Sequence, residues 1–592
     1  RSPSRGLGDV YKRQVYYEAC ARVVEMALFM PASRYFSESR LDAVLEVDGE
    51  LRAKFERYIS GDQQGKPFVV MLPHMTMSEA ASLLPRVFPG LPQVNVVFRP
   101  LNQPALNAWV EETRSRFGFR QLSRRSGYND AMAALRRSEG VGVLFDQDAS
   151  KSGTTSLFMG RLVSMTNLPG LMALRFDADI HLLLLERTQF WQAKLSLQQL
   201  PKCETPIEVA VRAHNLLEAY LKRDSHSAPD WLWLHRRWGH QSSSHKRFKL
   251  ATKRIELEQT NAINGNAETP RKTRLWVRMP NWLGDVVMAL PLLRAIRQAR
   301  PDFEITLIGK AAFQPLFDRL DVGERFIPLP QQGRGYFSTF YQLRRDYPDT
   351  YLLFTNSTRS DLEAFLTRCP QRMGMIRPGK KRQLLTDPYE LSTDVDESTT
   401  HQTQVWELML QRYGLVESLD TSPLPREESV RARPQVAMIC GTENAPEKRW
   451  PISHWRALVG QLLATVPEVE IVLFGTPADR VITDQVADGF SSGAIQNLAG
   501  KTDLAAFCDG LKQCNVVVCN DTGGMHLANM LGTPVVVVFG PTNPVRTGPI
   551  FEAPKHILQP EGCPATGGMP IEGVSAERVV EAVRPYVEGA QS

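Results

Sequence analysis

The stretch Arg274-Leu-Trp-Val-Arg-Met-Pro-Asn-Trp-Leu-Gly-Asp285 decides the fold of the second half of the chain. Its first six residues are mostly apolar and are typical of a buried strand. The following Pro280 to Gly284 predicts a tight turn, and residues 286–297 have the apolar spacing of a helix. A strand that passes at once through a turn into a helix is the repeating unit of a parallel α/β sheet.

The same unit recurs along the second half of the chain. Further strands are predicted at residues 304–308, 351–354, 436–439, 470–474, 516–519 and 535–539, with helical stretches between them. Repeated units of this kind predict doubly wound parallel sheets. A break around residues 394–434, rich in Asp, Glu, Ser and Pro, predicts two lobes, 273–433 and 434–592, with a cleft between them.

Length and composition limit the class of protein. The 592 residues exceed what one core supports, and 43% hydrophobic with 23% charged residues is typical of a soluble globular chain. No apolar run approaches the roughly 20 residues that cross a bilayer. The eight cysteines form no Cys-x-x-Cys pair, which indicates a reducing compartment without structural zinc or disulfides.

Charge is shared unevenly between the two halves. Residues 1–272 contain 38 Lys and Arg against 28 Asp and Glu, a net charge of +10, and the remainder has a net charge of −4. The basic half is expected to prefer an acidic partner or an anionic surface. The alternative, that the extra basic residues are a solvated face, stays open. No nucleic-acid partner is predicted.

A histidine and a glutamate form the candidate site of the first half. The predicted strand 67–72 delivers His74 into a turn, and Glu79 follows on the first turn of a helix that begins near Ser78. A carboxylate so placed can orient an imidazole and keep it basic for removing a proton from a hydroxyl. Acyl transfer also needs a cation for the oxyanion, and Arg99, after the strand 94–98, is the candidate. On this pair alone, a structural histidine remains the simpler interpretation.

Four further blocks accompany this pair. In order they are Phe98-Arg-Pro-Leu-Asn-Gln-Pro104, Gly140-Val-Gly-Val-Leu-Phe-Asp-Gln-Asp148, Phe158-Met-Gly160 with Thr166, and Trp231-Leu-Trp-Leu-His-Arg-Arg-Trp238. With them, residues 15–240 resemble the lipid A biosynthesis acyltransferases of the lysophospholipid acyltransferase superfamily. The resemblance implies an α/β fold, an acyl-carrier-protein or acyl-CoA donor, and His74 with Glu79 as the catalytic pair.

The resemblance also implies which partners the first half binds and where in the cell it acts. An acidic carrier protein fits the basic balance, with contacts expected at Arg124, Arg125, Arg136 and Arg137. Because the family calls for no ion, Asp146 is expected to have a structural or substrate-ordering role rather than a metal-binding one. Members begin with a hydrophobic membrane helix that is missing here, so the expectation is either truncation or peripheral association with the cytoplasmic face of the inner membrane.

Two segments are set apart from the predicted domains. Residues 1–14 show no helical or strand periodicity and are expected to be a non-native leader, whose Gly6 to Val10 imitates Leu283 to Val287 as a decoy. Residues 241–272 lose hydrophobic periodicity and fill with Ser, Lys, Asn, Gln and Thr, which predicts a linker.

The candidate site of the second half follows the strand that ends at Cys519. The run Asn520-Asp-Thr-Gly-Gly-Met-His526 lies where a parallel sheet binds anions. The Thr522 hydroxyl and the amides of Gly523 and Gly524 can cradle a diphosphate, and Lys448 supplies positive charge without a metal.

Four motifs carry a second resemblance: Pro280-Asn-Trp-Leu-Gly-Asp-Val-Val-Met288, Lys448-Arg-Trp-Pro451, Asn497-Leu-Ala-Gly-Lys-Thr502 and Asp521-Thr-Gly-Gly-Met-His526. With them, residues 273–585 resemble glycosyltransferase family 9, the ADP-heptose:lipopolysaccharide heptosyltransferases. The resemblance implies a two-lobed GT-B fold whose first lobe binds the acceptor and whose second binds the nucleotide sugar. It needs no cofactor or metal.

Residue roles follow from this second resemblance. Asp285 is the expected base that deprotonates the acceptor hydroxyl for inverting transfer. On local sequence alone, a helix cap at Asp285 is the competing interpretation. The residues expected to bind the nucleotide sugar are Thr442, Lys448, Arg449, Asp521, Thr522, Gly523, Gly524 and His526.

Two near-matches are rejected. Gly374-Met-Ile-Arg-Pro-Gly-Lys-Lys381 resembles a phosphate-binding loop, but Lys381 replaces the Ser or Thr that magnesium needs. Asp394-Val-Asp396 resembles a metal-binding pair, but it lies in a Ser/Thr/Asp-rich loop. Both are expected to be solvated connections.

The favoured interpretation is a bifunctional enzyme of lipopolysaccharide assembly. One half is expected to acylate a lipid A-like acceptor, and the other to transfer heptose from ADP-heptose to the core. One alternative keeps both enzyme classes but changes the lipid and the nucleotide sugar. The other makes the first half a catalytically silent module that docks on a membrane or on an acyl carrier.

Overall fold

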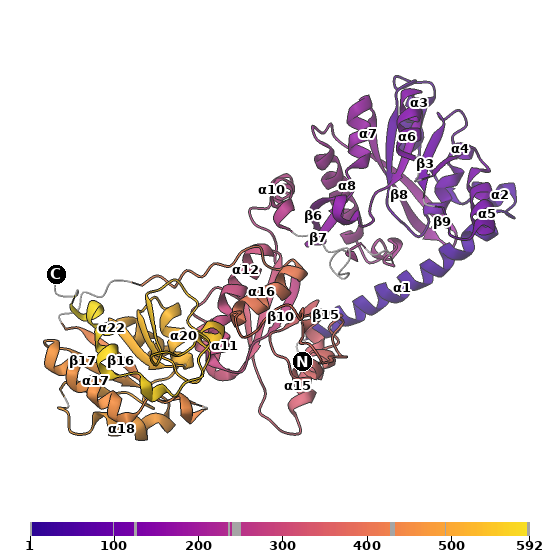
Figure 1. Cartoon of the computed structure of the whole chain (residues 1–592). Coiled ribbons are helices and arrows are strands. Elements are labelled where there is room, and N and C mark those ends of the chain that lie inside the picture. Colours follow the sequence, from indigo (N-terminus) through magenta and orange to yellow (C-terminus); the bar gives the residue numbers. More distant parts are fainter. Residues whose placement is uncertain are drawn as a thin grey trace. The chain divides into compact units, whose positions relative to one another are not determined.

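The computed structural model describes residues 3–98, 100–123, 127–234, 237–239, 250–426, 433–443, 445–491 and 493–588, with only the backbone given for residues 3–12 and 251. The chain forms two compact units, Arg1–Pro270 and Arg271–Ser592. Each unit is an α/β structure with helices on both faces of its sheets (Figure 1).

Unit 1 is built on a seven-stranded mixed sheet of order β1-β9-β8-β2-β5-β3-β4. All neighbouring strands are parallel except the β8–β9 pair, and a separate antiparallel hairpin is formed by β6 and β7. The strands are β1 (Leu45–Glu46), β2 (Phe68–Leu72), β3 (Val94–Phe98), β4 (Arg120–Ser123), β5 (Gly140–Leu144), β6 (Thr154–Phe158), β7 (Arg161–Met165), β8 (Asp179–Gln189) and β9 (Gln192–Gln199). Because β2 lies in the middle of the sheet, its carboxyl end opens onto neighbouring strand ends.

Alternation along β2 explains the two layers of helices in unit 1. Val69 and Met71 pack in a cluster with α6, α7 and α8, whereas Val70 and Leu72 pack on the opposite face with α3. The helices of this unit are α1 (Pro3–Ser33), α2 (Glu38–Asp42), α3 (Gly49–Ile59), α4 (Leu84–Val87), α5 (Pro104–Ser115), α6 (Gly127–Arg136), α7 (Leu168–Phe176), α8 (Pro206–Lys222) and α10 (Arg254–Ile263).

Both ends of unit 1 contain helices that the sequence pattern did not predict. The segment 1–14, which shows no helical periodicity, is helical from Pro3 as the start of α1, and its origin as a non-native leader stays a prediction. Part of the predicted linker is folded: α10 packs on the β6–β7 hairpin, where the Thr260 hydroxyl donates to Thr155 O (3.1 Å) and Glu256 accepts from Thr155 N (3.2 Å). Leu257 of α10 is buried against Leu157 and Leu162 of the hairpin. Because this segment shows no recurring apolar spacing in the sequence, the helix was not predicted.

Unit 2 contains two six-stranded parallel sheets of identical topology. The orders are β12-β11-β10-β13-β14-β15 and β18-β17-β16-β19-β20-β21, each the 3-2-1-4-5-6 order of a dinucleotide-binding fold. The strands are β10 (Thr273–Arg278), β11 (Phe303–Gly309), β12 (Arg325–Pro328), β13 (Thr350–Leu353), β14 (Gln371–Ile376), β15 (Asp387–Glu390), β16 (Gln435–Ile439), β17 (Glu470–Phe474), β18 (Ile495–Asn497), β19 (Val516–Asn520), β20 (Val535–Val538) and β21 (Lys555–Leu558). Unit 2 is therefore a two-lobed arrangement of Rossmann-like sheets.

The helices of unit 2 connect these strands. They are α11 (Leu283–Met288), α12 (Leu290–Ala299), α13 (Gln314–Phe317), α14 (Tyr336–Leu343), α15 (Thr358–Leu366), α16 (Gln402–Tyr413), α17 (Ile452–Thr465), α18 (Arg480–Ala487), α19 (Leu504–Gln513), α20 (Gly523–Met530), α21 (Pro544–Thr547) and α22 (Ala576–Glu588). One apolar cluster continues from lobe to lobe and includes Val277 of β10 and Ile439 of β16. The lobes therefore share part of one core.

Three details of unit 2 differ from expectation. The predicted helix 286–297 is two helices, α11 and α12, with Pro291 in the first turn of the second. The break at residues 394–434 contains α16, whose Val405 and Met409 are buried. Gly374, in the rejected phosphate-loop match, lies inside β14 rather than in a solvated connection.

Candidate active sites

The register of two parallel strands brings His74 and Asp146 together. Leu72, the last residue of β2, pairs with Leu144, the last residue of β5. His74 and Asp146 each follow two residues later, so they meet at the same edge of the sheet. The imidazole Nδ1 and Asp146 Oδ1 are 2.5 Å apart, and His74 N donates to Asp146 Oδ2 at 2.9 Å.

Asp146 is a buried and charged acceptor. Its side chain is 1% exposed, and the Trp231 indole also donates to Oδ2 at 2.6 Å. Although burial alone would raise the pKa of Asp146, the hydrogen bond and charge of His74 and the Trp231 indole hold it below its ordinary value. Because Nδ1 donates to this carboxylate, Nε2 is the nitrogen of His74 whose lone pair can accept a proton.

Glu79 does not supply the contact predicted for it. Its carboxylate accepts two hydrogen bonds from Arg114, at 2.9 Å from Nε and 2.5 Å from Nη2. It also lines a mainly apolar hollow of about 500 Å³ between α1 and α5, with Met26, Met30 and Trp109. Sequence spacing favoured Glu79 because it is near in the chain, whereas the sheet register brings Asp146 to Nδ1. Arg99 lies outside the described residues, as do Arg124 and Arg125.

A buried cation supports the segment after Asp146, and sequence analysis gave it no role. Arg237 is fully buried and donates to Gln147 O (2.6 Å), Ser164 O (2.9 Å) and His214 Nε2 (2.7 Å). Burial lowers the pKa of His214 to about 3, so this histidine is a neutral acceptor. The Gln147 amide in turn lies 3.1 Å from His74 Nε2. Arg237 could have been suspected only from its place in the Trp231 to Trp238 block.

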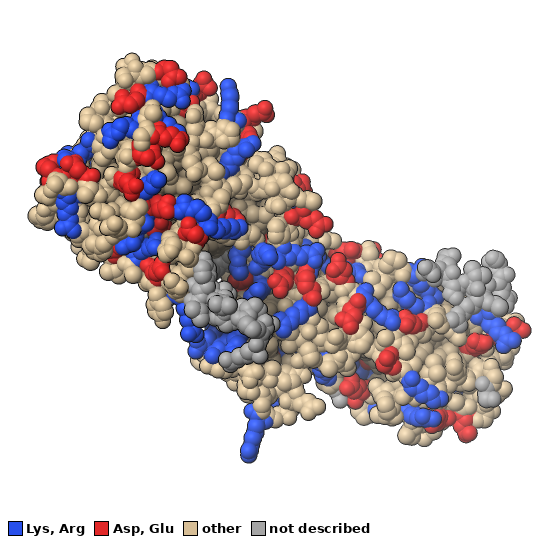
Figure 2. Space-filling model, turned by 180° about the vertical axis from the view of Figure 1, so that it is seen from behind, with Lys and Arg blue, Asp and Glu red and all other residues tan. Residues whose placement is uncertain are grey.

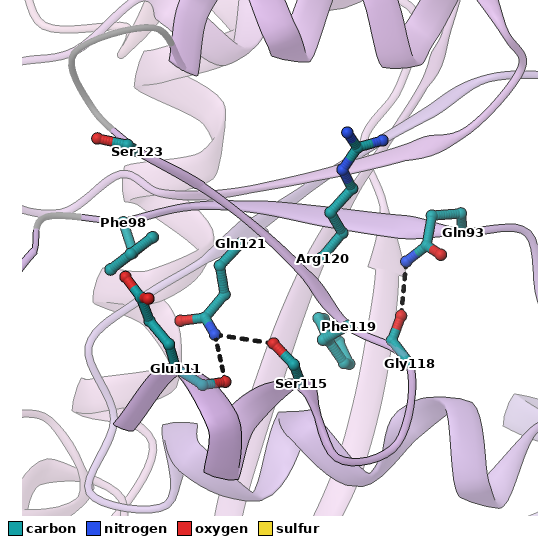
Figure 3. A pocket seen from close by; sticks show the side chains of 9 residues that line it. All are labelled: Gln93, Phe98, Glu111, Ser115, Gly118, Phe119, Arg120, Gln121 and Ser123. Atoms are coloured by element: carbon teal, nitrogen blue, oxygen red, sulfur yellow. Dashed lines mark hydrogen bonds between the residues drawn. The ribbon is translucent and has the colours of Figure 1, made fainter. Parts of the chain in front are cut away.

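A second hollow in unit 1 lies at the edge of the sheet, beside β4 and α5. It has a volume of about 450 Å³, and Figure 3 shows the Gln121 amide on its wall bonded to Glu111 O and the Ser115 hydroxyl. Arg120, the first residue of β4, also lines it. Of the predicted carrier contacts that are described, Arg136 is exposed and Arg137 pairs with Glu139. On the face in Figure 2, basic and acidic residues are interspersed over both units.

In unit 2, Asp285 lies in the first turn of α11, directly beyond the carboxyl end of β10. The fully buried pair Arg278–Glu363 fixes the intervening turn, since Arg278 also donates to Met279 O and, at 3.1 Å, to Asn281 Oδ1. Burial raises the pKa of Asp285; the positive charge of Arg546 opposes that rise, Asp521 adds to it and Lys448 opposes it. Asp285 is thus a carboxylate with an elevated proton affinity.

Lys448 and Asp521 form an ion pair in the second lobe, with Nζ 2.7 Å from Oδ2. Lys448 follows β16 and Asp521 follows β19, the two strands between which the order of the sheet reverses. Ligands of such sheets bind at this switch point. The carboxyl edges of the two lobes face one another, since a Cβ at Gly523 of α20 would lie 3.1 Å from Gly284 N of α11.

The amino terminus of α20 presents free donors. Among the described residues, the Thr522 hydroxyl is buried without a hydrogen-bond partner, and its side chain does not cap the helix. A Cβ at Gly523 would lie 2.9 Å from Leu283 Cβ, and one at Gly284 would lie 2.9 Å from His526 Cδ2. Glycine is therefore required where α11 and α20 meet. Burial lowers the pKa of His526 to about 4, so this ring is neutral.

Thr442 and Arg449 contact each other rather than the Asp521 loop. Arg449 Nε donates to Thr442 Oγ1 at 3.0 Å, and its Nη2 donates to Thr442 O at the same distance. Thr442 is buried. The residues that the structure brings together with Asp285 are Lys448, Asp521, Thr522, Gly523, Gly524 and His526. Thr442 and Arg449 instead contact each other within the loop that carries Lys448.

The two remaining sequence questions concern metals and membranes. Asp396 accepts from both the backbone and the hydroxyl of Ser398, a local turn rather than a metal site. Within the described residues, no group of three or more His, Cys, Asp and Glu side chains could hold a metal ion. In the same part of the chain, no helix combines the length and the apolarity that a bilayer span requires.

Comparisons with known proteins match each of the two units to a family of transferases. Residues 16–240 match the family model of bacterial lipid A biosynthesis acyltransferases, and residues 339–570 match glycosyltransferase family 9 (heptosyltransferase). The chain thus joins a region that matches an acyltransferase family to a region that matches the heptosyltransferase family.

Relatives of the second half are similar over most of their length. Lipopolysaccharide heptosyltransferase 2 of Salmonella typhimurium is 28% identical over 46% of this chain and 84% of its own. Lipooligosaccharide heptosyltransferase 2 of Haemophilus ducreyi is 27% identical over the same shares. The solved structure of E. coli ADP-heptose LPS heptosyltransferase II aligns with a TM-score of 0.47 and 24% identity, covering 54% of this chain and 100% of its own.

Proposed function

We propose that the chain is a bifunctional enzyme of lipopolysaccharide assembly. Unit 2 transfers heptose from ADP-heptose to the lipopolysaccharide core with inversion. Unit 1 transfers an acyl group from an acyl carrier protein, or from acyl-CoA, to a lipid A-like acceptor. The similarity to lipopolysaccharide heptosyltransferases over 84% of their length, together with the Asp285, Lys448 and Asp521 cluster, carries the first part.

In the proposed glycosyl transfer, Asp285 takes the proton of the acceptor hydroxyl, whose oxygen attacks the anomeric carbon as the bond to ADP breaks. Lys448 and the amino terminus of α20 stabilise the diphosphate that leaves. The unpartnered Thr522 hydroxyl supports this placement because a phosphate oxygen would satisfy it. Thr442 and Arg449 shape the loop that holds Lys448.

In the proposed acyl transfer, His74 Nε2 takes the proton of the acceptor hydroxyl, and the hydroxyl oxygen attacks the thioester carbonyl carbon. The carbon–sulfur bond then breaks and His74 returns the proton to the leaving thiol. Asp146 stabilises the imidazolium, a role first expected of Glu79. Glu79, which is paired with Arg114, instead lines the apolar hollow, where an acyl chain would be bound.

An apolar stripe on α1 supports association of unit 1 with the inner-membrane surface. Its exposed residues are Tyr17, Cys20, Ala21, Val24, Ala27, Leu28 and Pro31. The charged residues of the same stretch turn inward instead: Arg22 pairs with Asp230 and Glu25 with Arg187. A helix that exposes apolar residues to solvent is stabilised when an apolar surface such as a bilayer buries them. The basic net charge of unit 1 favours a bilayer that contains anionic lipids.

Two measurements test the proposal. In a panel of nucleotide sugars, ADP-heptose should raise the melting temperature of the full chain most, and another nucleotide sugar in that place would contradict the donor assignment. Sedimentation with anionic liposomes, run beside an acyl-transfer assay, tests unit 1. The exposed α1 stripe also suits a docking module: liposome binding without turnover, unchanged in His74→Ala, would support that second function.

A further inference from the structure

The carboxylate of Glu397 is held by two arginines that come from different lobes. Arg377, directly after β14, donates from Nε to both carboxylate oxygens at 2.9 and 3.0 Å. Arg546, on α21, approaches Oε2 at 3.2 Å. One carboxylate therefore faces two guanidinium groups, and the cluster retains an excess of positive charge.

The cluster contains polar groups that are available to bind a ligand. Gln402 is 7% exposed, its Oε1 lies 3.5 Å from Arg377 Nη2, and its Nε2 is buried without a partner among the described residues. The side chains of Arg377 and Arg546 are 31% and 39% exposed, so solvent or substrate reaches both. A buried amide beside the accessible guanidinium of Arg377, with the second guanidinium of Arg546 on the same carboxylate, is suited to an anion with several oxygens.

The cluster also lies beside the candidate base. Arg377 and Arg546 both follow strands at the carboxyl edges of their sheets, where Asp285 and Asp521 lie. The Thr403 hydroxyl, next to Gln402, donates to Met288 O of α11, the helix that carries Asp285, at 2.9 Å. Burial raises the pKa of Asp285, and the positive charge of Arg546 opposes that rise. The diphosphate has its own cation and helix terminus around Lys448 and α20, which leaves the Arg377–Arg546 side for the other substrate.

We propose that Arg377 and Arg546 form an anion-binding subsite for the acceptor, and that Glu397 occupies it as an internal substitute when the acceptor is absent. The ligand is a carboxylate or phosphate group carried by the acceptor glycan close to the hydroxyl that reacts. The inference rests on the proposed function, in which Asp285 is the base and this side of the cleft takes the acceptor. Both arginines can exchange the carboxylate of Glu397 for another oxyanion without a cation being left unpaired.

Because the arginines belong to different lobes, an anion held by both would bridge the lobes next to Asp285. The loop of Glu397 is already fixed to the second lobe, since Asn543 donates to Ser398 O (2.6 Å) and His401 Nε2 lies 3.0 Å from Gly548 O. The exchange therefore requires only the Glu397 side chain to turn away, not the lobes to separate.

Calorimetric titration of the full chain with glucuronate, glucose 6-phosphate and neutral glucose tests the subsite. Glu397→Gln should bind at least one of the two anions about tenfold more tightly than the wild type does, and adding Arg546→Gln should remove the gain. Asp394→Asn removes an equal charge from the same loop and should match the wild type. A gain with glucuronate alone identifies a carboxylate ligand, and one with glucose 6-phosphate alone a phosphate.

Unchanged affinity for both anions in folded Glu397→Gln would overturn the inference, as would a gain that persists with Arg546→Gln. If Glu397→Gln does not fold, Arg546→Gln alone decides: KM for the acceptor should rise about tenfold while KM for ADP-heptose stays constant, and equal KM values overturn the inference. Failure of the proposed function gives a different result. Heptose transfer would then be absent from the wild type and from every variant, while anion binding would still increase in Glu397→Gln.

Discussion

The His74 site lies at the edge of one sheet, whereas the Asp285 site is assembled from the edges of two. In the first, a single strand register fixes both His74 and Asp146. In the second, Asp285 belongs to one lobe and Lys448 and Asp521 to the other. The first geometry is set when one sheet folds, while the second depends on how closely the lobes of unit 2 approach.

The two sites also treat a carboxylate in opposite ways. Asp146 is almost fully buried, yet hydrogen bonds from His74 and Trp231 outweigh burial and lower its pKa. Asp285 is less deeply buried, and burial raises its pKa. The donors around a carboxylate, rather than its depth alone, therefore decide whether it is a permanent charge or a proton acceptor.

Removing each proposed base separately tests whether the His74 site and the Asp285 site act independently of each other. His74→Ala should reduce acyl transfer about 1000-fold and leave heptose transfer intact, and Asp285→Ala should do the reverse, since each removes the proposed general base of one reaction. Rates of both reactions on the same preparations provide the check. Asp285→Ala with undiminished heptose transfer and normal nucleotide binding would remove Asp285 from its role.

A smaller effect separates the two acidic residues near His74. Asp146→Asn should lower kcat for acyl transfer about 100-fold, because the imidazolium loses its buried counter-charge. Glu79→Gln should change kcat less than about tenfold, since Glu79 pairs with Arg114. Steady-state kinetics of the two variants measure this, and the opposite ranking would restore Glu79 as the partner of His74.

The pH dependence of heptose transfer tests the contrast between the carboxylates. Asp285 must be ionised to act as a base, and its raised pKa means that protonation begins at a higher pH than for an ordinary aspartate. The acid limb of kcat/KM should therefore lie at a higher pH than an ordinary aspartate would give. A limb at or below that range would show that burial does not control this carboxylate.

The smallest effect concerns an exposed contact between the lobes. Arg319 forms two hydrogen bonds with Asp509, at 2.5 and 2.8 Å, across the lobes of unit 2. Both side chains are largely exposed, so Asp509→Asn should change the free energy of unfolding by less than about 1 kcal/mol. Chemical denaturation measures this. A larger loss would mean that lobe contact depends on surface charge rather than on the shared apolar core.

Much of unit 2 was predictable because its strands are short apolar runs followed by glycine-rich turns. The strands containing Trp276, Ile471 and Val517 were all identified, and Asp285 and Asp521 were placed correctly at strand ends. Strands such as β14 and β15 were missed: β14 reads Gln-Arg-Met-Gly-Met-Ile, with polar residues and a glycine, and becomes a strand only through its neighbours.

The partner of His74 could not be predicted from spacing. Glu79 is five residues away in sequence, and Asp146 is 72 residues away, so only the pairing of β2 with β5 reveals the contact. Arg237 and His214 were missed for the same reason, because a buried arginine is recognisable only from the carbonyl groups that surround it. Long-range pairing, not local propensity, sets these positions.

The packing of α10 has a practical consequence for dissecting the enzyme. The family match of the first half ends at residue 240, but α10 covers the β6–β7 hairpin as far as Ile263, and Lys253 also bonds to that hairpin. A fragment cut at the family boundary would uncover Leu157 and Leu162 and leave Thr155 without its partners. Insolubility of such a piece would then say nothing about catalysis, and a cut after Pro270 is the sound choice for separating the activities.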